Sequence, residues 1–423
     1  MQTCLANFEH DLGEHLLKHL SHSGIPAQLH SPLLVDSLGL PRYWVSIWAL
    51  YSCADLAHAT KEKQLRYIEE LYCFSDRLKG AGSLDTSIAK IDIASLGELL
   101  EAYFVSILNR SVINESTQAK WQIAFKFITE TLMRLSKSNS PLNQLREIEA
   151  KLDRLKLLYQ QLRIRRPTTQ DSVRSLPASV VEALYILLDP TATTNPFRNE
   201  ATKWQAYVIF IVLLHQGLRR GELLSLPIDA VKSGYDKDLG STRYWLSVRE
   251  NPYATNHNDT RYSRPSIKTL TSIRQIPVSE LTANIIQEYI ENYRGKPSHP
   301  FLINSQQGNP LSTESITLLF KNLSHSLPAN VLHDLELRTG KTSITAHDLR
   351  HTCAVIRLNQ MLKIGSSMDV ALQKMRSFFG WSRSSDMPRK YAKAVFEDRL
   401  AEVWSNVFDE RIEILRALPK GKI

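Results

Sequence analysis

The sequence predicts a mostly helical α+β protein in two parts, an all-helical first part and a second part with a small antiparallel β-sheet inserted among helices. Apolar residues recur at intervals of three and four along most of the chain, which is the period of an α-helix. Residues 243–248 and 273–278 instead have the pattern of short strands and bracket a polar stretch. A length of 423 residues is typical of two or three domains.

Four helices are predicted in the first part, over residues 60–78, 95–109, 116–136 and 141–164. Each carries an apolar face, so we expect them to pack as one bundle within residues 41–170. Residues 1–40 are interrupted by glycine and proline. They are expected to form one or two short helices, as an N-terminal extension of unknown role. The stretch 163–169, which contains arginines and a proline, predicts a linker after the bundle.

The second part, residues 171–423, begins with two predicted helices, at 176–188 and 204–214, before the two strands. Helical periodicity returns at 279–292, 312–325, 347–362 and 368–379. Residues 394–417 carry another apolar stripe at helical spacing. That last helix would pack on its own domain or dock in a neighbouring copy of the chain.

Composition narrows the function classes. The net charge is +9 and the pI is near 9.2, with the basic excess in the second part, which is compatible with a nucleic-acid partner without establishing one. The longest apolar run, 207–214, is too short to cross a bilayer, and the N-terminus lacks a signal-peptide pattern. We therefore expect a cytoplasmic protein. The 4 cysteines have no metal-binding or redox spacing, so we expect idle or buried thiols, no metal and no cofactor.

Two arginines follow the predicted helix at 204–214, in the segment GLRRGEL at 217–223. Glu222 lies three residues after Arg219, which makes the two side chains neighbours on a helix. A guanidinium oriented by a carboxylate suits a phosphodiester, which offers two non-bridging oxygens. An ordinary surface salt bridge has the same spacing, so this segment alone does not decide.

The segment HDLRHT, residues 347–352, places His347 and Arg350 on one face near the start of a helix. Backbone N–H groups at such a helix start favour an anion. A histidine and an arginine at this spacing also occur on protein surfaces that bind nothing, so this segment alone does not decide. The spacing of His351 is interpreted as pointing it elsewhere, in a structural role.

Two further residues have reactive side chains in basic surroundings. Lys268 precedes the second strand near a hairpin turn, from which a mobile lysine could donate a proton in a cleft. Tyr391 follows the segment FGWS, residues 379–382, by about ten residues and lies among six arginines and lysines between 376 and 399. Neighbouring cations can lower a phenol pKa. The alternatives without a catalytic role are that Lys268 is a turn lysine exposed to solvent and that Tyr391 only packs on its helix.

Taken together, in this order and at these intervals, GLRRGEL, SIKT with RQIP, HDLRHT, FGWS and Tyr391 resemble the tyrosine recombinase (phage integrase) family. The resemblance covers about 176–400 and, more loosely, 40–165. It implies a helical core-binding (SAM-like) domain at 41–170 and a tyrosine recombinase catalytic domain with a C-terminal helix at 171–423. The sequence departs from the family at Trp381, where most members have histidine, and in the ten-residue interval to Tyr391, one longer than usual.

The resemblance implies a site-specific DNA recombinase, of the integrase or resolvase type, that uses neither metal nor ATP. Tyr391 would attack the scissile phosphate and leave a 3′-phosphotyrosine. Arg219 and Arg350 would hold the two non-bridging oxygens of that phosphate. The alternatives are a type IB topoisomerase, a non-enzymatic DNA-binding regulator on the same fold and, least of all, a metal-dependent nuclease.

The remaining roles also come from the resemblance. His347 and Trp381 would donate hydrogen bonds to the phosphate, and His347 could also take the phenol proton. Lys268 would protonate the departing 5′ oxygen, and Glu222 would hold Arg219.

The partner implied is double-stranded DNA with inverted-repeat sites, in prokaryotic nucleoid-associated DNA. A monomer or dimer when free would assemble as a homotetramer on two sites, with or without an accessory protein or second recombinase. Basic residues in the linker, near the hairpin and around the nucleophile are expected to contact DNA: Arg163, Arg165, Arg166, Arg264, Arg383, Arg389, Lys390 and Lys393.

Overall fold

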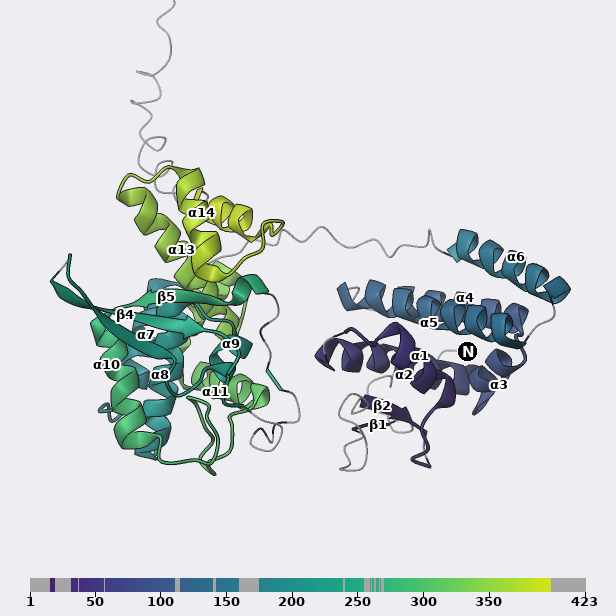
Figure 1. The fold of residues 1–423 in the computed structure, drawn as a ribbon, viewed down its shortest axis with the longest axis horizontal. Helices are drawn as coiled ribbons and strands as arrows, with labels where there is room; N and C mark the ends of the chain where they lie inside the picture. The colour runs from purple at the N-terminus through teal and green to yellow at the C-terminus, as the bar shows by residue number, and fades with distance from the viewer. Residues whose placement is uncertain are drawn as a thin grey trace, which may run out of the picture. The chain divides into compact units, whose positions relative to one another are not determined.

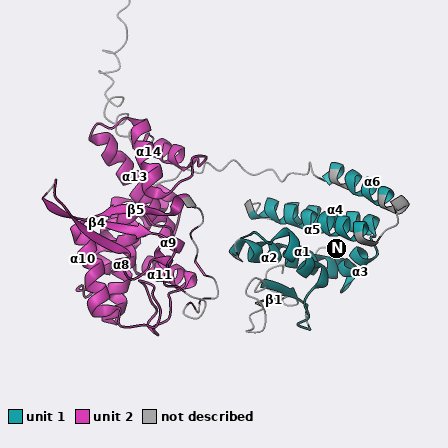
Figure 2. Ribbon diagram, in the orientation of Figure 1, with its two compact units in different colours: residues 1–170 teal, residues 171–423 magenta. Residues whose placement is uncertain are grey.

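The structure is a computed structural model. It describes residues 16–19, 32–110, 115–139, 142–159, 175–254 and 259–396, apart from positions 37, 57, 239, 260, 262, 263, 266, 268 and 269. The chain divides into two compact units, residues 1–170 and 171–423 (Figure 2). No helix in the described part is long and apolar enough to span a membrane.

The first unit contains a pair of short antiparallel strands and a helical bundle (Figure 1). Strand β1, Leu16–His19, pairs antiparallel with β2, Pro32–Val35. The expectation of helices within residues 1–40 is wrong for these segments: four-residue pieces are too short for a stable helix, whereas two of them can satisfy each other's backbone groups by pairing. The helices are α1 Tyr43–Ser52, α2 His58–Lys79, α3 Ser83–Ala89, α4 Ile93–Leu108, α5 Glu115–Asn139 and α6 Leu142–Tyr159.

Large aromatic side chains form the centre of this bundle. Trp48, Tyr72 and Phe127 are fully buried together, and Trp121 packs against Phe104. All four helices predicted for this part are present as α2, α4, α5 and α6. The sequence analysis missed α1 and α3, which are short and depend on the apolar faces of their longer neighbours for burial.

The second unit surrounds one small sheet with helices (Figure 1). Strands β3 Val231–Asp236, β4 Ser241–Val248 and β5 Arg274–Val278 form an antiparallel sheet in the order β3-β4-β5. The mostly helical fold class with a small antiparallel sheet is confirmed. The helices are α7 Ala178–Leu188, α8 Glu200–Gln216, α9 Arg220–Ser225, α10 Glu280–Glu288, the π-turn Tyr289–Tyr293, α11 Thr313–Ser326, α12 Ala329–Thr339, α13 Ala346–Lys363 and α14 Met368–Phe379. Residues 387–396 are helical as well.

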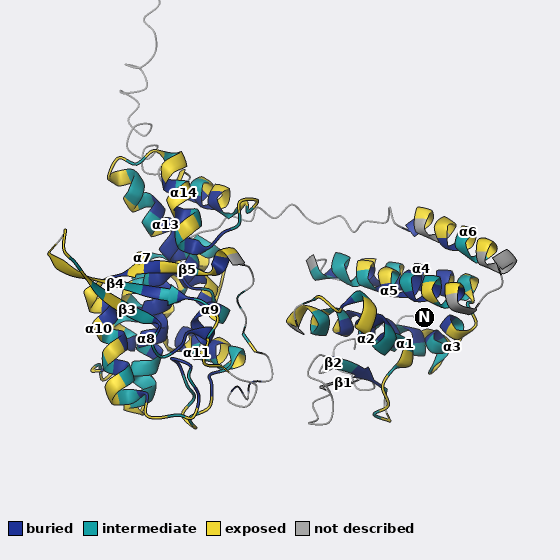
Figure 3. Ribbon diagram, in the orientation of Figure 1, coloured by how far each residue is buried: buried dark blue, intermediate teal, exposed yellow. Residues whose placement is uncertain are grey.

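Helix α8 is the central element of this unit. Its residues 208–214 are buried without exception (Figure 3), because α7, α10 and α13 pack around it. Helix α13 also packs against α14. Through these contacts the fold brings the end of α8, the start of α13 and the end of α14 to one place, although they lie far apart in the sequence.

Candidate active site

Three chain segments meet at two glycines in the second unit. Gly217 ends α8 with φ of +57°, and a Cβ there would lie 2.4 Å from Cε1 of Phe379. Gly380 ends α14 with φ of +62°, and a Cβ there would lie 2.9 Å from Cα of Ser272. Only glycine fits such a positive φ and such a close approach. The two residues therefore let the α8–α9 turn, the 272–274 segment and the α14 terminus come together.

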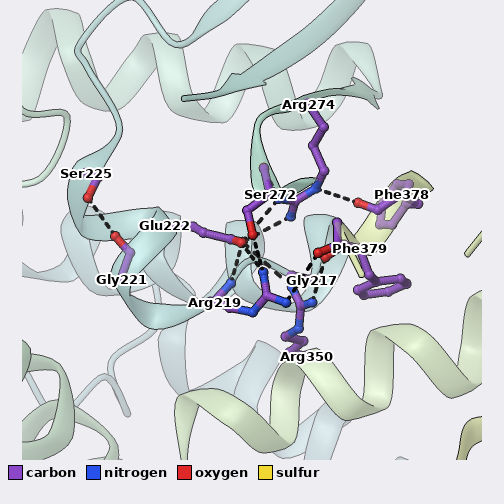
Figure 4. A network of polar contacts seen from close by, with 11 residues as sticks. Gly217, Arg219, Gly221, Glu222, Ser225, Ser272, Arg274, Arg350, Phe378 and Phe379 are labelled. Atoms are coloured by element: carbon purple, nitrogen blue, oxygen red, sulfur yellow. Dashed lines mark hydrogen bonds and ion pairs between the residues drawn. The ribbon is translucent and has the colours of Figure 1, made fainter. Parts of the chain in front are cut away.

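Glu222 is the centre of an arginine cluster (Figure 4). Its Oε1 accepts hydrogen bonds from Nη1 of Arg219 at 2.6 Å and Nη1 of Arg274 at 3.2 Å. Its Oε2 accepts from the backbone N–H of Arg219 at 2.9 Å and Nη2 of Arg274 at 3.0 Å. Burial alone would raise the pKa of Glu222, but Arg274 and Arg350 hold it below the ordinary value. The carboxylate is therefore ionised and accepts four hydrogen bonds. The two that come from Arg219 fix the position of that residue.

Arg274 is a site residue that the sequence analysis missed. It lies in the RQIP segment quoted for the family resemblance, but no role was given to it. Besides its two bonds to Glu222, its Nε donates to the carbonyl of Phe378 at 2.7 Å and its Nη1 to that of Ser272 at 2.6 Å. Arg274 therefore ties Glu222 to the end of α14. The available signal was an arginine at the first position of a strand that directly follows the predicted hairpin lysine.

Arg350 joins the cluster from α13 and is 2% exposed. Its Nη1 donates to the carbonyl of Gly217 at 2.5 Å and its Nη2 to that of Phe379 at 2.8 Å. Nη1 is 3.7 Å from Oε2 of Glu222, too long for a hydrogen bond. Burial lowers the pKa of Arg350 to about 10, so it remains a cation at neutral pH. Two backbone carbonyls and one ion pair therefore orient this guanidinium.

Tyr391 is fully buried beside this cluster, in the helix of residues 387–396. Its ring stacks on Trp381, with centroids 5.2 Å apart and planes 15° apart. Trp381 in turn stacks on Phe379 at 4.9 Å. Burial raises the pKa of the phenol well above its ordinary value, while the nearby charges of Arg350 and Arg219 lower it in part. In this structure Tyr391 is a neutral phenol on an aromatic platform.

The two histidines of α13 differ in exposure, since His351 is half-buried. His347 is exposed, with its ring edge-on to His351 at 4.2 Å. Nδ1 of His351 is 2.5 Å from the hydroxyl of Tyr391. The interpretation that His351 points away from the site is therefore wrong, because residues three and four positions after His347 both border its helix face. That spacing was the signal that could have found it.

Both imidazoles are poor bases in this structure. Burial and the neighbouring His347 lower the pKa of His351 to about 3. His347, although exposed, loses part of its hydration to neighbouring side chains, and this loss, followed by the charge of Arg350, lowers its pKa. His351 is therefore neutral at physiological pH, and it forms an uncharged hydrogen bond with the neutral phenol of Tyr391.

The structure brings Arg219, Glu222, Arg350, Trp381 and Tyr391 into one site, with His347 at its edge. Lys268 lies outside the described residues, as do Arg163, Arg165 and Arg166. The other residues expected to contact DNA are exposed: Arg264, Arg383, Arg389, Lys390 and Lys393. The described residues contain no group of three or more His, Cys, Asp or Glu side chains that could hold a metal ion. Cys53 and Cys353 are buried free thiols.

A comparison with protein-family models assigns the chain to a family. The phage integrase family model matches residues 175–397, more than half of the chain. The protein therefore belongs to the phage integrase family, whose members are tyrosine recombinases. None of the curated proteins matches the sequence.

Several solved structures are similar to the chain. XerH site-specific recombinase bound to difH substrate, in a pre-cleavage complex, is 14% identical with a TM-score of 0.44, over 81% of this chain and 79% of that one. XerA recombinase is 13% identical with a TM-score of 0.33, over 85% and 98%. A lambda integrase dimer bound to a COC′ core site is 12% identical with a TM-score of 0.41, over 83% and 95%.

Proposed function

We propose that the protein is a site-specific DNA recombinase that cleaves and rejoins duplex DNA through a 3′-phosphotyrosine intermediate, without metal or ATP. The observation that carries this proposal is the convergence of the buried Tyr391 with the oriented Arg219 and Arg350, which lie 172 and 41 residues before it in the sequence. Burying charged side chains costs free energy. Their convergence on one place is typical of a site that stabilises an anionic transition state.

The chemistry follows from the orientation of the side chains. Glu222 and two backbone carbonyls fix Arg219 and Arg350, whose remaining N–H groups would hold the non-bridging oxygens of the scissile phosphate. Cations held in place beforehand need no reorganisation when charge develops on these oxygens. Tyr391 would attack phosphorus, and Lys268 would give its proton to the departing 5′ oxygen. The covalent link keeps the energy of the broken bond, so a 5′ hydroxyl of a partner strand can reverse the step.

The exposed His347 would donate a hydrogen bond to the bound phosphate. Trp381 is 6% exposed and stacks on the ring of Tyr391. It would donate a hydrogen bond to the phosphate and also hold the ring of the nucleophile in position. The proposed substrate is duplex DNA with inverted-repeat sites, bound by the first unit as a core-binding domain and by the catalytic unit. A homotetramer on two sites, with or without an accessory protein, would complete the reaction in a prokaryotic cytoplasm. The apolar stripe at 394–417, which would serve tetramer docking, extends beyond the described residues.

The direct test uses Tyr391→Phe and a suicide substrate nicked beside the scissile phosphate. The variant keeps the stacked ring and loses only the hydroxyl, so it should bind DNA like the unmodified protein and form no covalent adduct on a denaturing gel. An adduct formed by the variant would assign the nucleophile to another residue. Products from two-site plasmids separate the alternatives: recombinant circles support a recombinase, relaxed circles alone a type IB topoisomerase, and DNA binding without any adduct a regulator.

The role of Lys268 has its own test. Lys268→Ala should cleave slowly on ordinary DNA and recover on a substrate with a 5′-bridging phosphorothiolate, whose leaving group needs no proton. Failure to recover would deny this lysine the role of general acid. Cleavage that persists in EDTA would exclude a metal-dependent nuclease.

A further inference from the structure

The connection between β4 and β5 carries the proposed general acid. It covers residues 249–273, and Lys268 lies near its end. Connections longer than about 15 residues are uncommon in compact domains, and many of them are functional. A general acid must lie within hydrogen-bond reach of the oxygen that it protonates. A lysine on so long a connection therefore depends on whatever holds that connection in place.

A buried ion pair lies midway along this connection. Asp259 and Arg261 are each 7% exposed. Nε of Arg261 donates to Oδ1 of Asp259 and Nη2 donates to Oδ2, both at 2.8 Å. Burial alone would raise the pKa of Asp259, but the hydrogen bonds and the charge of Arg261 hold it below its ordinary value. The carboxylate is therefore ionised, and the two parallel hydrogen bonds fix the plane of the guanidinium.

Arg261 also ties the connection to α9. Its Nη1 donates to the carbonyl of Leu224 at 2.9 Å and to that of Leu311 at 3.4 Å. The carbon of its guanidinium lies 4.1 Å from the centre of the Phe301 ring. Leu224 belongs to α9, the helix that also carries Glu222 of the arginine cluster. The connection is thus held to the helix that orients the proposed phosphate-binding arginines.

Two further contacts lie on either side of Lys268 in the sequence. Oγ of Ser225, the last residue of α9, donates to the carbonyl of Pro265 at 3.2 Å. Nη1 of Arg219 donates to Oγ of Ser272, which is 0% exposed, at 3.0 Å. Lys268 follows the first of these anchors by three residues and precedes the second by four. Because an extended chain advances at most about 3.6 Å per residue, the two anchors limit how far position 268 can lie from α9.

Stability alone gives little reason for a buried ion pair at this place. Removing two charges from water costs free energy, and replacing such a pair by apolar residues of similar volume is often neutral or stabilising. A bidentate contact between a guanidinium and a carboxylate instead has one defined geometry. The pair therefore suits a role in which the position of the connection matters more than its stability.

We propose that Asp259 and Arg261 position the proton donor: they hold the connection on α9 so that Lys268 reaches the 5′ oxygen of the scissile bond. Both are positioning residues, because they act through the lysine. This inference rests on the proposed recombinase function and on the role given there to Lys268. It implies that α9 aligns both the arginine cluster and the general acid with one phosphate.

The test begins with Arg261→Met, which removes the hydrogen-bond donors and keeps much of the side-chain length. Arg294→Met is the matched control, because Arg294 is 6% exposed and donates to backbone carbonyls within residues 299–302 instead. Single-turnover cleavage is measured on the ordinary suicide substrate and on one with a 5′-bridging phosphorothiolate. A sulfur leaving group needs no proton, so the ratio of the two rates reports the general acid alone.

Arg261→Met should slow cleavage of ordinary DNA at least about 10-fold, as part of the roughly 100- to 10,000-fold contribution of a general acid. It should leave cleavage of the phosphorothiolate nearly unchanged. Arg294→Met should change both rates by the same factor. In a Lys268→Ala background, Arg261→Met should add no further loss on ordinary DNA, because a residue that acts through another is not additive with it.

Ser225→Ala is a milder variant that leaves the ion pair intact. It removes a hydroxyl shared between the carbonyls of Gly221 and Pro265. The expected loss is about 2- to 10-fold on ordinary DNA, the usual value of one hydrogen bond, and none on the phosphorothiolate. This variant decides the same comparison if Arg261→Met does not fold.

Two results would overturn the inference alone. Arg261→Met, or Ser225→Ala in its place, could slow both substrates by the same factor, or Arg261→Met could add its full loss to that of Lys268→Ala. Either would make the ion pair purely structural, while the adduct of the unmodified protein would keep the recombinase assignment. If Lys268→Ala itself failed to recover on the phosphorothiolate, the role of this lysine and the inference would fall together. Absence of any adduct from the unmodified protein would overturn the proposed function as well.

Discussion

The arginine cluster around Glu222 and the aromatic pocket around Tyr391 share a boundary at Arg350 and Phe379, yet they bury polar groups in different ways. The cluster pairs three guanidiniums with one carboxylate and with backbone carbonyls. The pocket keeps a phenol and an imidazole neutral by removing them from water. For the proposed cleavage, the cluster would supply charge fixed in advance for the phosphate, and the pocket holds the proposed nucleophile as a neutral phenol.

The largest effect is expected from removing charge that would face the phosphate. Arg219→Ala should slow cleavage by at least about 100-fold, the usual loss for one transition-state contact. Its neighbour Arg220 is exposed and donates to Thr317 instead, so Arg220→Ala is the matched control. Single-turnover cleavage of the suicide substrate compares them. An equal loss of cleavage rate in the two variants would show that the orientation of Arg219 by Glu222 gives it no special role.

Glu222→Gln tests whether the cluster depends on its one anion. The amide keeps the shape but leaves three neighbouring guanidiniums without a counter-charge. Breaking a buried ion pair costs about 3–5 kcal/mol, and we expect a loss of that size in the free energy of unfolding, together with slower cleavage. Urea unfolding measures the first quantity. A variant as stable as the unmodified protein would show that backbone carbonyls alone suffice for Arg350 and Arg274.

Gly217→Ala tests the backbone that joins the two regions. The added methyl would lie 2.4 Å from the ring of Phe379, at a positive φ that alanine disfavours. Such strain and overpacking cost about 1–3 kcal/mol. Gly340, with φ of +69° and open space around it, is the control for strain alone. Thermal unfolding should show the larger loss at Gly217; equal losses would mean that Phe379 moves aside freely.

The smallest effect concerns pH and the neutral pocket. His351 has a pKa of about 3 when folded and an ordinary value near 6.5. As pH falls from 6.5 to 5.5 the unfolded chain binds a proton that the folded chain does not, so stability is complete above 6.5 and falls by at most about 1.4 kcal/mol over this first pH unit. The neighbouring charges are His347, Lys341 and Arg350, opposed by Asp348. His351→Asn should flatten this decline in urea titrations; an unchanged profile would contradict it.

Local sequence was sufficient for much of the fold. The period of apolar residues located most helices to within a few positions, because burying one face fixes that period wherever the helix packs. It missed β3, whose sequence VKSGYD has little apolar content, the seven-residue helix α3, and also α1 and α12. Those elements are held by neighbours rather than by their own pattern.

The sequence by itself determined the chemical inventory of the site: an arginine beside a glutamate, a histidine three residues before an arginine, and a tyrosine in a basic segment. Only the tertiary structure decided how these groups combine. Arg274 joined Glu222, and His351 rather than His347 met Tyr391, because both contacts link residues at least 40 positions apart. Such pairings depend on how α13, α14 and β5 pack, and no local period of the sequence encodes the distance between two side chains on different elements.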